Sequence, residues 1–393
     1  MAIWIKRENS MRKVTILALH LAYGGVEKAV CEFANLMAER YDVEILSVYD
    51  MPNAPAYPID SRVKITYLLK DIPNREEWKE ALHARNIPSL LKESVRAAAI
   101  LVQKRTSVIR AVRNIPSGVV VAMRDEHAVL LSRYGQAGVM KIAQLHQDHA
   151  YEKKLVRHFQ HDYGGIDVFT LLSPKMEQEV QELMQGNKHT RVLYVPNFME
   201  TIPPEADPRN RDRTVLSVGR LHPVKGYDRL IRLFAKIHEQ FPAWKLVIVG
   251  SGEEQGRLEK CISEFALEGC VTLAGRYSAP EVQQAMTKAA VFAMSSYSEG
   301  FPFVLLEAMS CSLPIVAFDT RGGLNMLVHD GENGRLVGQE EDFCEALACL
   351  MRDDALREKM AGSSRALSLA FSREAVGKIW FDLIEEHFQH ERE

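Results

Sequence analysis

The sequence predicts an α/β protein made of two doubly wound, Rossmann-like domains. Two observations lead to this fold class. The chain has 393 residues, more than one hydrophobic core usually organises. Short runs of β-branched residues alternate with helical patterns along both halves, which is typical of parallel sheets covered by helices. A stretch rich in proline and charge, residues 196–212, separates the halves and is typical of a linker.

Strands are expected wherever a short apolar run is rich in valine and isoleucine. In the first half these runs are Val14–His20, Val43–Tyr49, Val63–Leu68, Val119–Met123, Val139–Leu145, Val168–Leu172 and Val192–Val195. In the second half they are Val215–Val218, Lys245–Val249, Val271–Ala274, Val291–Ser295, Ile315–Phe318 and Arg335–Val337. Helical patterns lie between many of them, for example at Val26–Glu39, Pro174–Met184 and Tyr227–Gln240.

We therefore expect an N-terminal domain over residues 1–200, a linker over 201–213 and a second domain over 214–371. The chain ends in an amphipathic helix, residues 372–393, with Val376, Trp380 and Ile384 on its apolar side. This helix is expected to cross back to the N-terminal domain. Ligands of doubly wound sheets bind beyond the carboxyl ends of the strands, so two facing domains predict a site in a central cleft.

Composition limits the possible partners and the compartment. The formal net charge of −3 provides no overall attraction to nucleic acid, and we expect no nucleic-acid partner. Six cysteines occur without a Cys-x-x-Cys pair, which favours buried free thiols in a reducing compartment. The first residues lack a signal peptide, Met11 could be the true start, and no apolar run reaches the ~18 residues that span a bilayer. We expect a cytoplasmic protein, with peripheral contact at the inner face of the membrane left open.

One segment of the first half, Asp71–Asn114, contains no clear strand. Its part Lys92–Arg113 carries six cations against the single acid Glu93, and Leu91, Val95, Val102, Ile109 and Val112 can share one side of a helix. A basic amphipathic helix can lie in a membrane interface. The alternative is a surface helix with one solvated and one packed face.

The first candidate site is the loop from Gly219 to Gly226. It follows a strand and precedes a helix, so Arg220 and Lys225 lie where doubly wound sheets bind their ligands. Arginine offers a planar fork of donors and lysine a compact charge, and both suit phosphate oxygens. The alternative is two surface cations beside a turn.

The second candidate site runs from Ser298 to Met309, after another strand. A helix is expected to start near Pro302 or Phe303, where free backbone N–H groups and the helix dipole form an anion site. Glu307 lies inside an apolar run one turn into this helix, and Glu299 precedes it. Carboxylates beside a phosphate site suit hydroxyl groups, so we assign Glu307 to a ribose and Glu299 to a sugar. The alternatives are a capping acid and a surface glutamate.

These motifs together resemble glycosyltransferase family 4, whose members are retaining enzymes with the two-Rossmann GT-B fold. The resemblance rests on Gly219-Arg-Leu, Lys225-Gly-Tyr-Asp-Arg-Leu-Ile, Leu246-Val-Ile-Val-Gly-Ser-Gly, Glu299-Gly-Phe-Pro, Leu305-Leu-Glu-Ala-Met-Ser-Cys-Ser-Leu-Pro-Ile-Val-Ala and Asp330-Gly-Glu-Asn-Gly. It is close over residues 214–337 and scattered over the first half. In combination these motifs are specific, whereas the fold by itself says little about substrate.

The resemblance implies a role for each matching residue. Arg220 and Lys225 match the pair that grips the donor diphosphate, and Glu299 and Glu307 match the glutamates of the Glu-x7-Glu motif. In the N-terminal domain Gly24 and Gly25 match the glycine loop near the diphosphate and acceptor, and His146 matches the histidine near the transferred sugar. We expect Arg220, Lys225, Glu299 and His146 to be catalytic, and the donor to contact Gly24, Gly25, Gly219, Glu307, Gly300, Phe301, Pro302, Phe303, Val304, Ser251, Gly252, Arg276 and Tyr277.

The resemblance implies a metal-independent hexosyltransferase without a cofactor. The expected donor is a nucleotide sugar, with UDP as the nucleotide that the habits of the family favour, and the expected acceptor is a glycan or lipid-linked glycan of a bacterial surface polymer. The leaving phosphate would help to deprotonate the acceptor in a front-face substitution. One residue departs from the pattern: Met326 stands where the family often has a glutamate, and the neighbouring Asn325 could replace it as a neutral partner.

Other interpretations remain open at this stage. His146, His149, His158 and His161, with Asp148 and Asp162, could form a metal cluster, although their spacing is unusual for one; the last three are otherwise surface histidines. A nucleotide-sugar epimerase would use the donor alone. A hydride-transfer enzyme is less favoured because Leu21–Val26 lacks a Gly-x-Gly-x-x-Gly turn, and a silent scaffold is less favoured because all four charged site residues are present.

Overall fold

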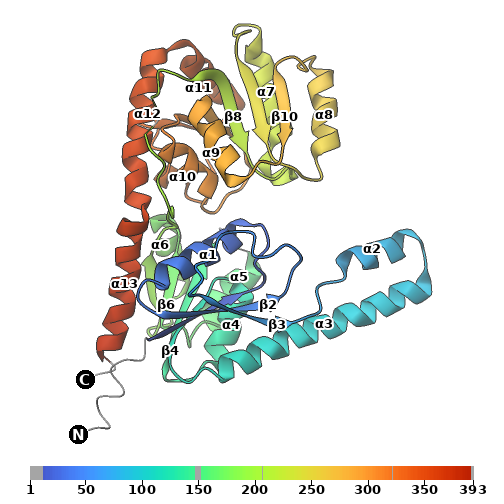
Figure 1. Cartoon of the computed structure of the whole chain (residues 1–393), viewed down its shortest axis with the longest axis vertical. Helices are drawn as coiled ribbons and strands as arrows, with labels where there is room; N and C mark the ends of the chain where they lie inside the picture. The colour runs from blue at the N-terminus through green and yellow to red at the C-terminus, as the bar shows by residue number, and fades with distance from the viewer. Residues whose placement is uncertain (1–11, 147–151, 206, 321, 391–393) are drawn as a thin grey trace. The chain divides into compact units, whose positions relative to one another are not determined.

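The computed structural model describes residues 12–146, 152–205, 207–320 and 322–390. The chain divides into two compact units, one formed by Met1–Val195 with Trp380–Glu393 and the other by Pro196–Ile379. Each unit contains one parallel sheet, so the α/β class predicted from the sequence is confirmed (Figure 1).

The first unit is built on a seven-stranded sheet with the order β3-β2-β1-β4-β5-β6-β7. The order reverses at β1, which is the sign of a doubly wound sheet with a topological switch point between β1 and β4. Its strands are β1 (Lys13–Ala18), β2 (Asp42–Tyr49), β3 (Lys64–Leu69), β4 (Gly118–Ala122), β5 (Val139–Leu145), β6 (Val168–Leu171) and β7 (Arg191–Tyr194). Its helices are α1 (Gly25–Met37), α2 (Arg75–His83), α3 (Ile87–Arg113), α4 (Asp125–Tyr134), α5 (Lys153–His161) and α6 (Pro174–Leu183).

The second unit repeats the scheme with six strands in the order β10-β9-β8-β11-β12-β13, and its switch point lies between β8 and β11. The strands are β8 (Asp212–Val218), β9 (Lys245–Val249), β10 (Val271–Gly275), β11 (Ala289–Met294), β12 (Ile315–Phe318) and β13 (Gly334–Val337). The helices are α7 (Tyr227–His238), α8 (Gln255–Glu264), α9 (Ala279–Lys288), α10 (Phe303–Ser310), α11 (Glu340–Arg352) and α12 (Asp354–Ser368), with short 3₁₀ turns η1 (Pro223–Lys225), η2 (Leu324–Met326) and η3 (Leu369–Phe371).

Every strand expected from the sequence is present, with small shifts at the ends. The first strand, for example, stops at Ala18 rather than His20, and β11 begins at Ala289 rather than Val291. The strands were recognisable because most are buried on both faces, which makes them continuous apolar runs.

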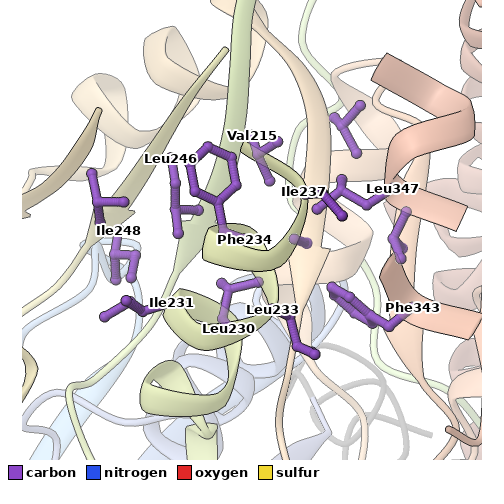
Figure 2. Packing of buried hydrophobic residues seen from close by; sticks show 14 of the residues in the cluster. Val215, Leu230, Ile231, Leu233, Phe234, Ile237, Leu246, Ile248, Phe343 and Leu347 are labelled. Atoms are coloured by element: carbon purple, nitrogen blue, oxygen red, sulfur yellow. The ribbon is translucent and has the colours of Figure 1, made fainter. Parts of the chain in front are cut away.

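Helix α7 anchors the core of the second unit and thereby positions the loop in front of it. Its buried side chains, among them Leu230 and Phe234, lie between the strand residues Val215 and Leu246 and residue Phe343 of α11 (Figure 2). Each fully buried side chain of this kind contributes about 1.5–3 kcal/mol of transfer free energy. The first turn of α7 is therefore held rigidly at the carboxyl edge of the sheet.

The last helix, α13 (Arg373–His390), is divided between the two units. Its residues up to Ile379 belong to the second unit, and those from Trp380 onward belong to the first. Within the second unit, its neighbour Ser372 forms an isolated parallel bridge with Met199, in the segment that follows β7. Within the first unit, Trp380 is buried edge-on against Phe33 of α1, with the ring centroids 4.8 Å apart. The expected linker residues 201–213 fall inside the second unit, and β8 already begins at Asp212.

The segment Asp71–Asn114 is helical, as expected, and forms the hairpin α2–α3, which projects from its own unit (Figure 1). No helix within the described residues has the length and apolar character needed to cross a bilayer. All six cysteines carry free thiols, and burial raises the pKa of the Cys31 thiol to about 12.

Candidate functional site

The loops that follow β8, β9 and β10 are bound to one another at the carboxyl edge of the second sheet. The Gly219 N–H group donates to the carbonyl of Val249 (2.9 Å), and Leu221 N–H donates to the carbonyl of Ser251 (3.0 Å). The next connection in the same direction is from Gly250 N–H to the carbonyl of Gly275 (2.8 Å). Because these bonds continue the sheet beyond its strands, they hold the predicted donor residues Gly219, Ser251, Gly252, Arg276 and Tyr277 along one edge.

Lys225 ends the 3₁₀ turn η1, directly before α7. The turn can reverse into the helix because Gly226 adopts the left-handed conformation, with φ 62°. A Cβ atom at Gly226 would also lie 2.4 Å from the carbonyl oxygen of Ser295. The Ser295 hydroxyl donates to the carbonyl of Lys225 (3.0 Å), so the loop after β8 and the loop after β11 are tied together.

The structure joins two of the predicted catalytic residues in an ion pair. The Lys225 Nζ atom lies 2.6 Å from Oε1 of Glu299, and the side chains are only 22% and 11% exposed. The Ser296 hydroxyl donates to the same oxygen at 2.6 Å. The ammonium group of Lys225 is therefore held in a defined place by a largely buried carboxylate.

The backbone of Glu299 is packed tightly against Gly322, in the loop after β12. A Cβ atom at Gly322 would lie 1.6 Å from the carbonyl oxygen of Glu299 and 3.1 Å from the Cα atom of Gly300. Only glycine fits there without displacing the Glu299 segment. Sequence reasoning did not single out Gly322, although the Gly-Gly pair at residues 322–323 was a signal of close backbone approach.

Arg229, on the first turn of α7, binds the loop after β11, which carries Glu299. Its Nη2 group donates to the carbonyls of Ser295 (2.5 Å) and Ser296 (3.3 Å). Its guanidinium carbon lies 3.7 Å from the ring centroid of Phe318 and 4.2 Å from that of Tyr297. Stacking of this kind is favourable for arginine and fixes its plane. Arg229 therefore positions the loop after β11. It lies inside the motif that begins at Lys225, but the sequence alone assigned it no role.

Helix α10 starts where the sequence predicts it, with Pro302 as its N-cap residue and Phe303 as its first residue. Among the described residues no side chain caps this end by a hydrogen bond, and the dipole of the helix start favours an anion there. Glu307 is half-buried one turn further on. Phe301 is buried against Phe371, with the ring centroids 5.8 Å apart, and is a packing residue of the site.

Arg220 lies at the exposed surface of the loop after β8. Within the described part of the chain its side chain makes no hydrogen bond or ion pair, so the structure does not join it to the Lys225–Glu299 pair. Met326 is half-buried and Asn325 exposed in the short turn η2. The roles expected for Arg220, Glu307 and Asn325 remain predictions.

In the first unit, Gly24 and Gly25 form the turn from β1 into α1, with Gly24 as N-cap residue. The Gly24 N–H group points to the hydroxyl of Tyr57 at 3.4 Å, and the ring of Tyr57 meets that of Tyr23 edge-on. This turn lies at the switch point of the sheet, where doubly wound folds bind ligands.

A buried carboxylate at this switch point was missed by sequence reasoning. Glu27, on the first turn of α1, is 4% exposed and forms an ion pair with Arg124, which follows β4. His20, after β1, lies 3.6 Å from the same carboxylate oxygen. The pKa of His20 is lowered, mainly by burial and further by Arg124, although Glu27 opposes the shift. Glu27 and Arg124 are 97 residues apart, so no local pattern could connect them.

His146 follows β5 at the same edge of the first sheet. Burial lowers the pKa of His146 to about 3, and the charge of Arg124 acts in the same direction. Among the described residues neither ring nitrogen has a hydrogen-bond partner. The imidazole is therefore neutral at physiological pH, with one donor and one acceptor available.

The structure gives little support to a metal site built from these histidines. His149 and Asp148 lie outside the described residues. His158 is half-buried rather than fully at the surface, and its Nδ1 atom lies 2.5 Å from Asp125, which also accepts from the Tyr163 hydroxyl. Within the described ranges, no three His, Cys, Asp or Glu side chains gather as a metal site would require. Independence from metal ions remains a prediction.

Comparison with known proteins decides the class of the second unit. Residues 198–366 match the family described as glycosyl transferases group 1. The second unit is a glycosyl transferases group 1 domain. This match covers the Lys225–Glu299 pair, Gly322 and the start of α10. The resemblance to a glycosyltransferase inferred from the sequence is therefore confirmed, and family 4 is consistent with it.

Curated relatives extend the similarity to the first unit. An exopolysaccharide phosphotransferase of Streptomyces coelicolor is 28% identical over 384 residues, which are 92% of this chain and 39% of that protein. The N-acetylgalactosamine-N,N'-diacetylbacillosaminyl-diphospho-undecaprenol 4-alpha-N-acetylgalactosaminyltransferase of Campylobacter jejuni is 32% identical over 216 residues, 53% of this chain and 58% of the other. This chain thus spans less than two thirds of either relative.

Among solved structures, the pneumococcal O-GlcNAc transferase GtfA in complex with UDP and GlcNAc superimposes with a TM-score of 0.73. The match covers 96% of this chain and 99% of that chain at 14% sequence identity, so it shows the fold alone. The fold is GT-B, as the sequence predicted. Nothing in these comparisons supports the alternative of an epimerase.

Proposed function

We propose that the chain transfers a sugar from a nucleotide diphosphate sugar, with UDP as the nucleotide, to a glycan or lipid-linked acceptor in bacterial surface polysaccharide synthesis. Transfer would retain the anomeric configuration and need no metal ion. Peripheral contact with the inner face of the membrane through Lys92–Arg113 belongs to the same proposal. The single observation that carries it is the Lys225–Glu299 pair at the carboxyl edge of a group 1 domain.

The diphosphate is the part of the donor that this edge suits best. Lys225 supplies a positioned positive charge, and the start of α10 adds backbone N–H groups and a dipole equivalent to about half a charge. Both act on the charge that develops on the departing phosphate, and such preorganised electrostatics is often the largest catalytic contribution. Arg220, exposed in the same loop, would close on the phosphate as a second cation.

The remaining residues would handle hydroxyl groups. Glu299 is a sugar-hydroxyl acceptor and Glu307, one turn into α10, a ribose acceptor. The neutral His146 of the first unit would donate to or accept from a hydroxyl of the transferred sugar. Support for the UDP donor comes from the pneumococcal relative, which binds UDP. Support for a lipid-linked acceptor comes from the Campylobacter relative, whose name specifies a diphospho-undecaprenol substrate.

The proposal is tested by calorimetric titration of the protein with UDP, GDP and UDP-sugars in the presence of EDTA. Binding of UDP by the wild type and at least ~10-fold weaker binding by Arg220→Ala are expected, since one charge-assisted contact to phosphate contributes about 1.5–3 kcal/mol. A matched control is Arg213→Ala, because Arg213 is also exposed but lies near the amino end of β8, the strand that Arg220 follows.

Equal UDP affinity in the Arg220 and Arg213 variants would contradict the diphosphate site. An NMR measurement of the anomeric configuration in the transferred sugar tests retention separately. Loss of turnover on adding EDTA, restored by a divalent ion, would contradict metal independence.

A further inference from the structure

Helix α3 carries apolar side chains on two different faces. One face is packed: Ile100, Val108 and Val112 are at most 4% exposed and belong to the core of the first unit. The other face is uncovered, and its members, which we call the exposed stripe, are 62–69% exposed: Ile87, Leu91, Val95, Leu101 and Val102. The sequence pattern had grouped Leu91, Val95 and Val102 with Val112, but burial separates them because the helix is apolar on both faces.

The exposed stripe runs along most of the length of α3 in the described structure. Ile87, Leu91 and Val95 follow each other at four-residue spacing, and Val102 falls on the same side of the helix two turns later. Leu82, near the carboxyl end of α2, is also 46% exposed. Single exposed apolar residues are common, but a continuous row on one helix indicates a contact surface.

Positive charge accompanies the exposed stripe. Lys92, Arg96, Arg105 and Arg110 are all exposed on α3. The only acid in the helix, Glu93, is buried and accepts a hydrogen bond from the Asn74 amide (2.7 Å). Acids of the hairpin are otherwise confined to α2, at Glu76, Glu77 and Glu80. Glu93 also lies 3.7 Å from Arg96, whereas α3 carries no further acid to balance Lys92, Arg105 and Arg110. The outer face of α3 therefore presents apolar groups beside an excess of cations.

The hairpin is preorganised rather than a loose extension. Trp78 of α2 donates from Nε1 to the Ser94 hydroxyl of α3 (3.0 Å), and Asn74 also donates to the Glu93 carbonyl (2.9 Å). Further along α3, Lys104 forms an ion pair with Glu126 of α4 at 2.6 Å. Because α3 is held at these positions, the projection seen in Figure 1 can present its outer face without first having to fold.

We propose that the exposed stripe of α3 lies in the headgroup layer of an anionic lipid bilayer, with its apolar side chains at the acyl boundary and its cations at the lipid phosphates. A helix that is apolar on one side and basic beside it has the chemistry for this position. A second copy of the chain is disfavoured as occupant, since two such faces would oppose like charges. The inference deepens the proposed function and rests on it in one respect: a lipid-linked acceptor would be met at this surface.

Flotation with vesicles tests the proposal on the full chain. The wild type is expected to float with phosphatidylglycerol–phosphatidylcholine vesicles, to remain behind with phosphatidylcholine alone, and to bind less as salt rises. The triple variant Leu91→Ser, Val95→Ser and Val102→Ser is expected to bind at least ~10-fold more weakly. Its matched control is Phe265→Ser, an exposed apolar residue of the second unit.

A charge variant provides an independent arm. Replacing Lys92, Arg96 and Arg105 by Gln should weaken binding about fivefold for each cation removed. The control replaces three exposed lysines elsewhere by Gln: Lys188, Lys245 and Lys260. Since all substituted side chains are exposed, the melting temperature should stay at the wild-type value.

Three outcomes would overturn the inference. They are equal flotation of the wild type and the triple variant, flotation that ignores the lipid charge, and a wild-type dimer in solution that the triple variant abolishes. Titration with UDP separates this inference from the transfer function. Hairpin variants that lose vesicle binding but keep UDP affinity support the lipid surface, whereas a wild type that floats but ignores UDP refutes the nucleotide site alone.

Discussion

Substituting Gly322 by alanine tests how tightly the Glu299 segment is positioned. The added Cβ atom would lie 1.6 Å from the carbonyl oxygen of Glu299 and 2.7 Å from its carbonyl carbon. Both atoms belong to backbone, so no flexible side chain can give way. The contact must open from 1.6 Å to at least 3.0 Å, and the loop after β11 or the loop after β12 has to move by more than 1 Å.

The magnitude follows from the size of this displacement. Overpacking of a well-packed region costs about 1–3 kcal/mol, and for a unit of this size that lowers the melting temperature by a few degrees up to about 10 °C. The functional cost is expected to be larger, because a misplacement of ~1 Å at a reacting group can reduce turnover ~100-fold. Glu299 carries the Lys225 ammonium with it, so nucleotide binding should weaken as well.

Thermal unfolding and UDP titration of Gly322→Ala measure both effects. Gly256→Ala is the matched control: it lies in α8, a Cβ atom there meets nothing within 4 Å, and alanine should stabilise the helix by about 0.5–1 kcal/mol. If Gly322→Ala matched the wild type in melting temperature and UDP affinity, the packing argument for the Glu299 segment would be refuted.

Three further predictions concern charge, packing and pH. Glu299→Gln should tighten UDP binding several-fold, because the carboxylate charge that repels the phosphates is removed, and it should lower turnover. Titration and a sugar-transfer assay measure the two effects, and weaker UDP binding would contradict the expected repulsion. Phe343→Ala should lower the free energy of unfolding in urea by about 3–5 kcal/mol, because the ring is fully buried and stacked on Phe318; a loss below ~1 kcal/mol would contradict the packing. Burial lowers the pKa of His127 to about 4, so the unfolded chain binds the additional proton below pH 6.5 and stability should fall by up to about 1.4 kcal/mol per pH unit down to pH 4. Urea unfolding across that pH range measures the effect. The free energy of unfolding of His127→Gln should change less steeply with pH than that of the wild type, and identical pH dependence would exclude His127 as the cause.

The fold was largely predictable because its signals are local. Strands such as β5 and β9 are short apolar runs bounded by polar loops, and their limits match the expected ones. The loop before α7 and the start of α10 were also visible, since each joins a strand to a helix within a few residues. Order along the chain was enough to place Lys225 and Glu299 on loops at the same edge of one sheet.

Contacts that join distant parts of the chain were not predictable in the same way. The Glu27–Arg124 pair and the Gly322–Glu299 contact depend on which strands become neighbours, and no period in the sequence reports that. The exposed stripe of α3 is a different case. Its residues were noticed, but periodicity cannot say which of two apolar faces packs, and only burial distinguishes Leu91 from Val112.

The ion pair between Lys225 and Glu299 sets an electrostatic condition on any phosphate that binds there. An ammonium group has three donors, so Lys225 can keep its bond to Glu299 and still reach phosphate oxygens. The carboxylate nevertheless opposes a dianionic ligand, and at 11% exposure solvent screens this repulsion little. The charge of Glu299 therefore weakens binding of the substrate before the reaction. We expect Glu299 to contribute during the transfer step instead, by accepting from a sugar hydroxyl or by orienting Lys225. Glutamine retains the acceptor oxygen without the charge, which is why Glu299→Gln separates binding from turnover.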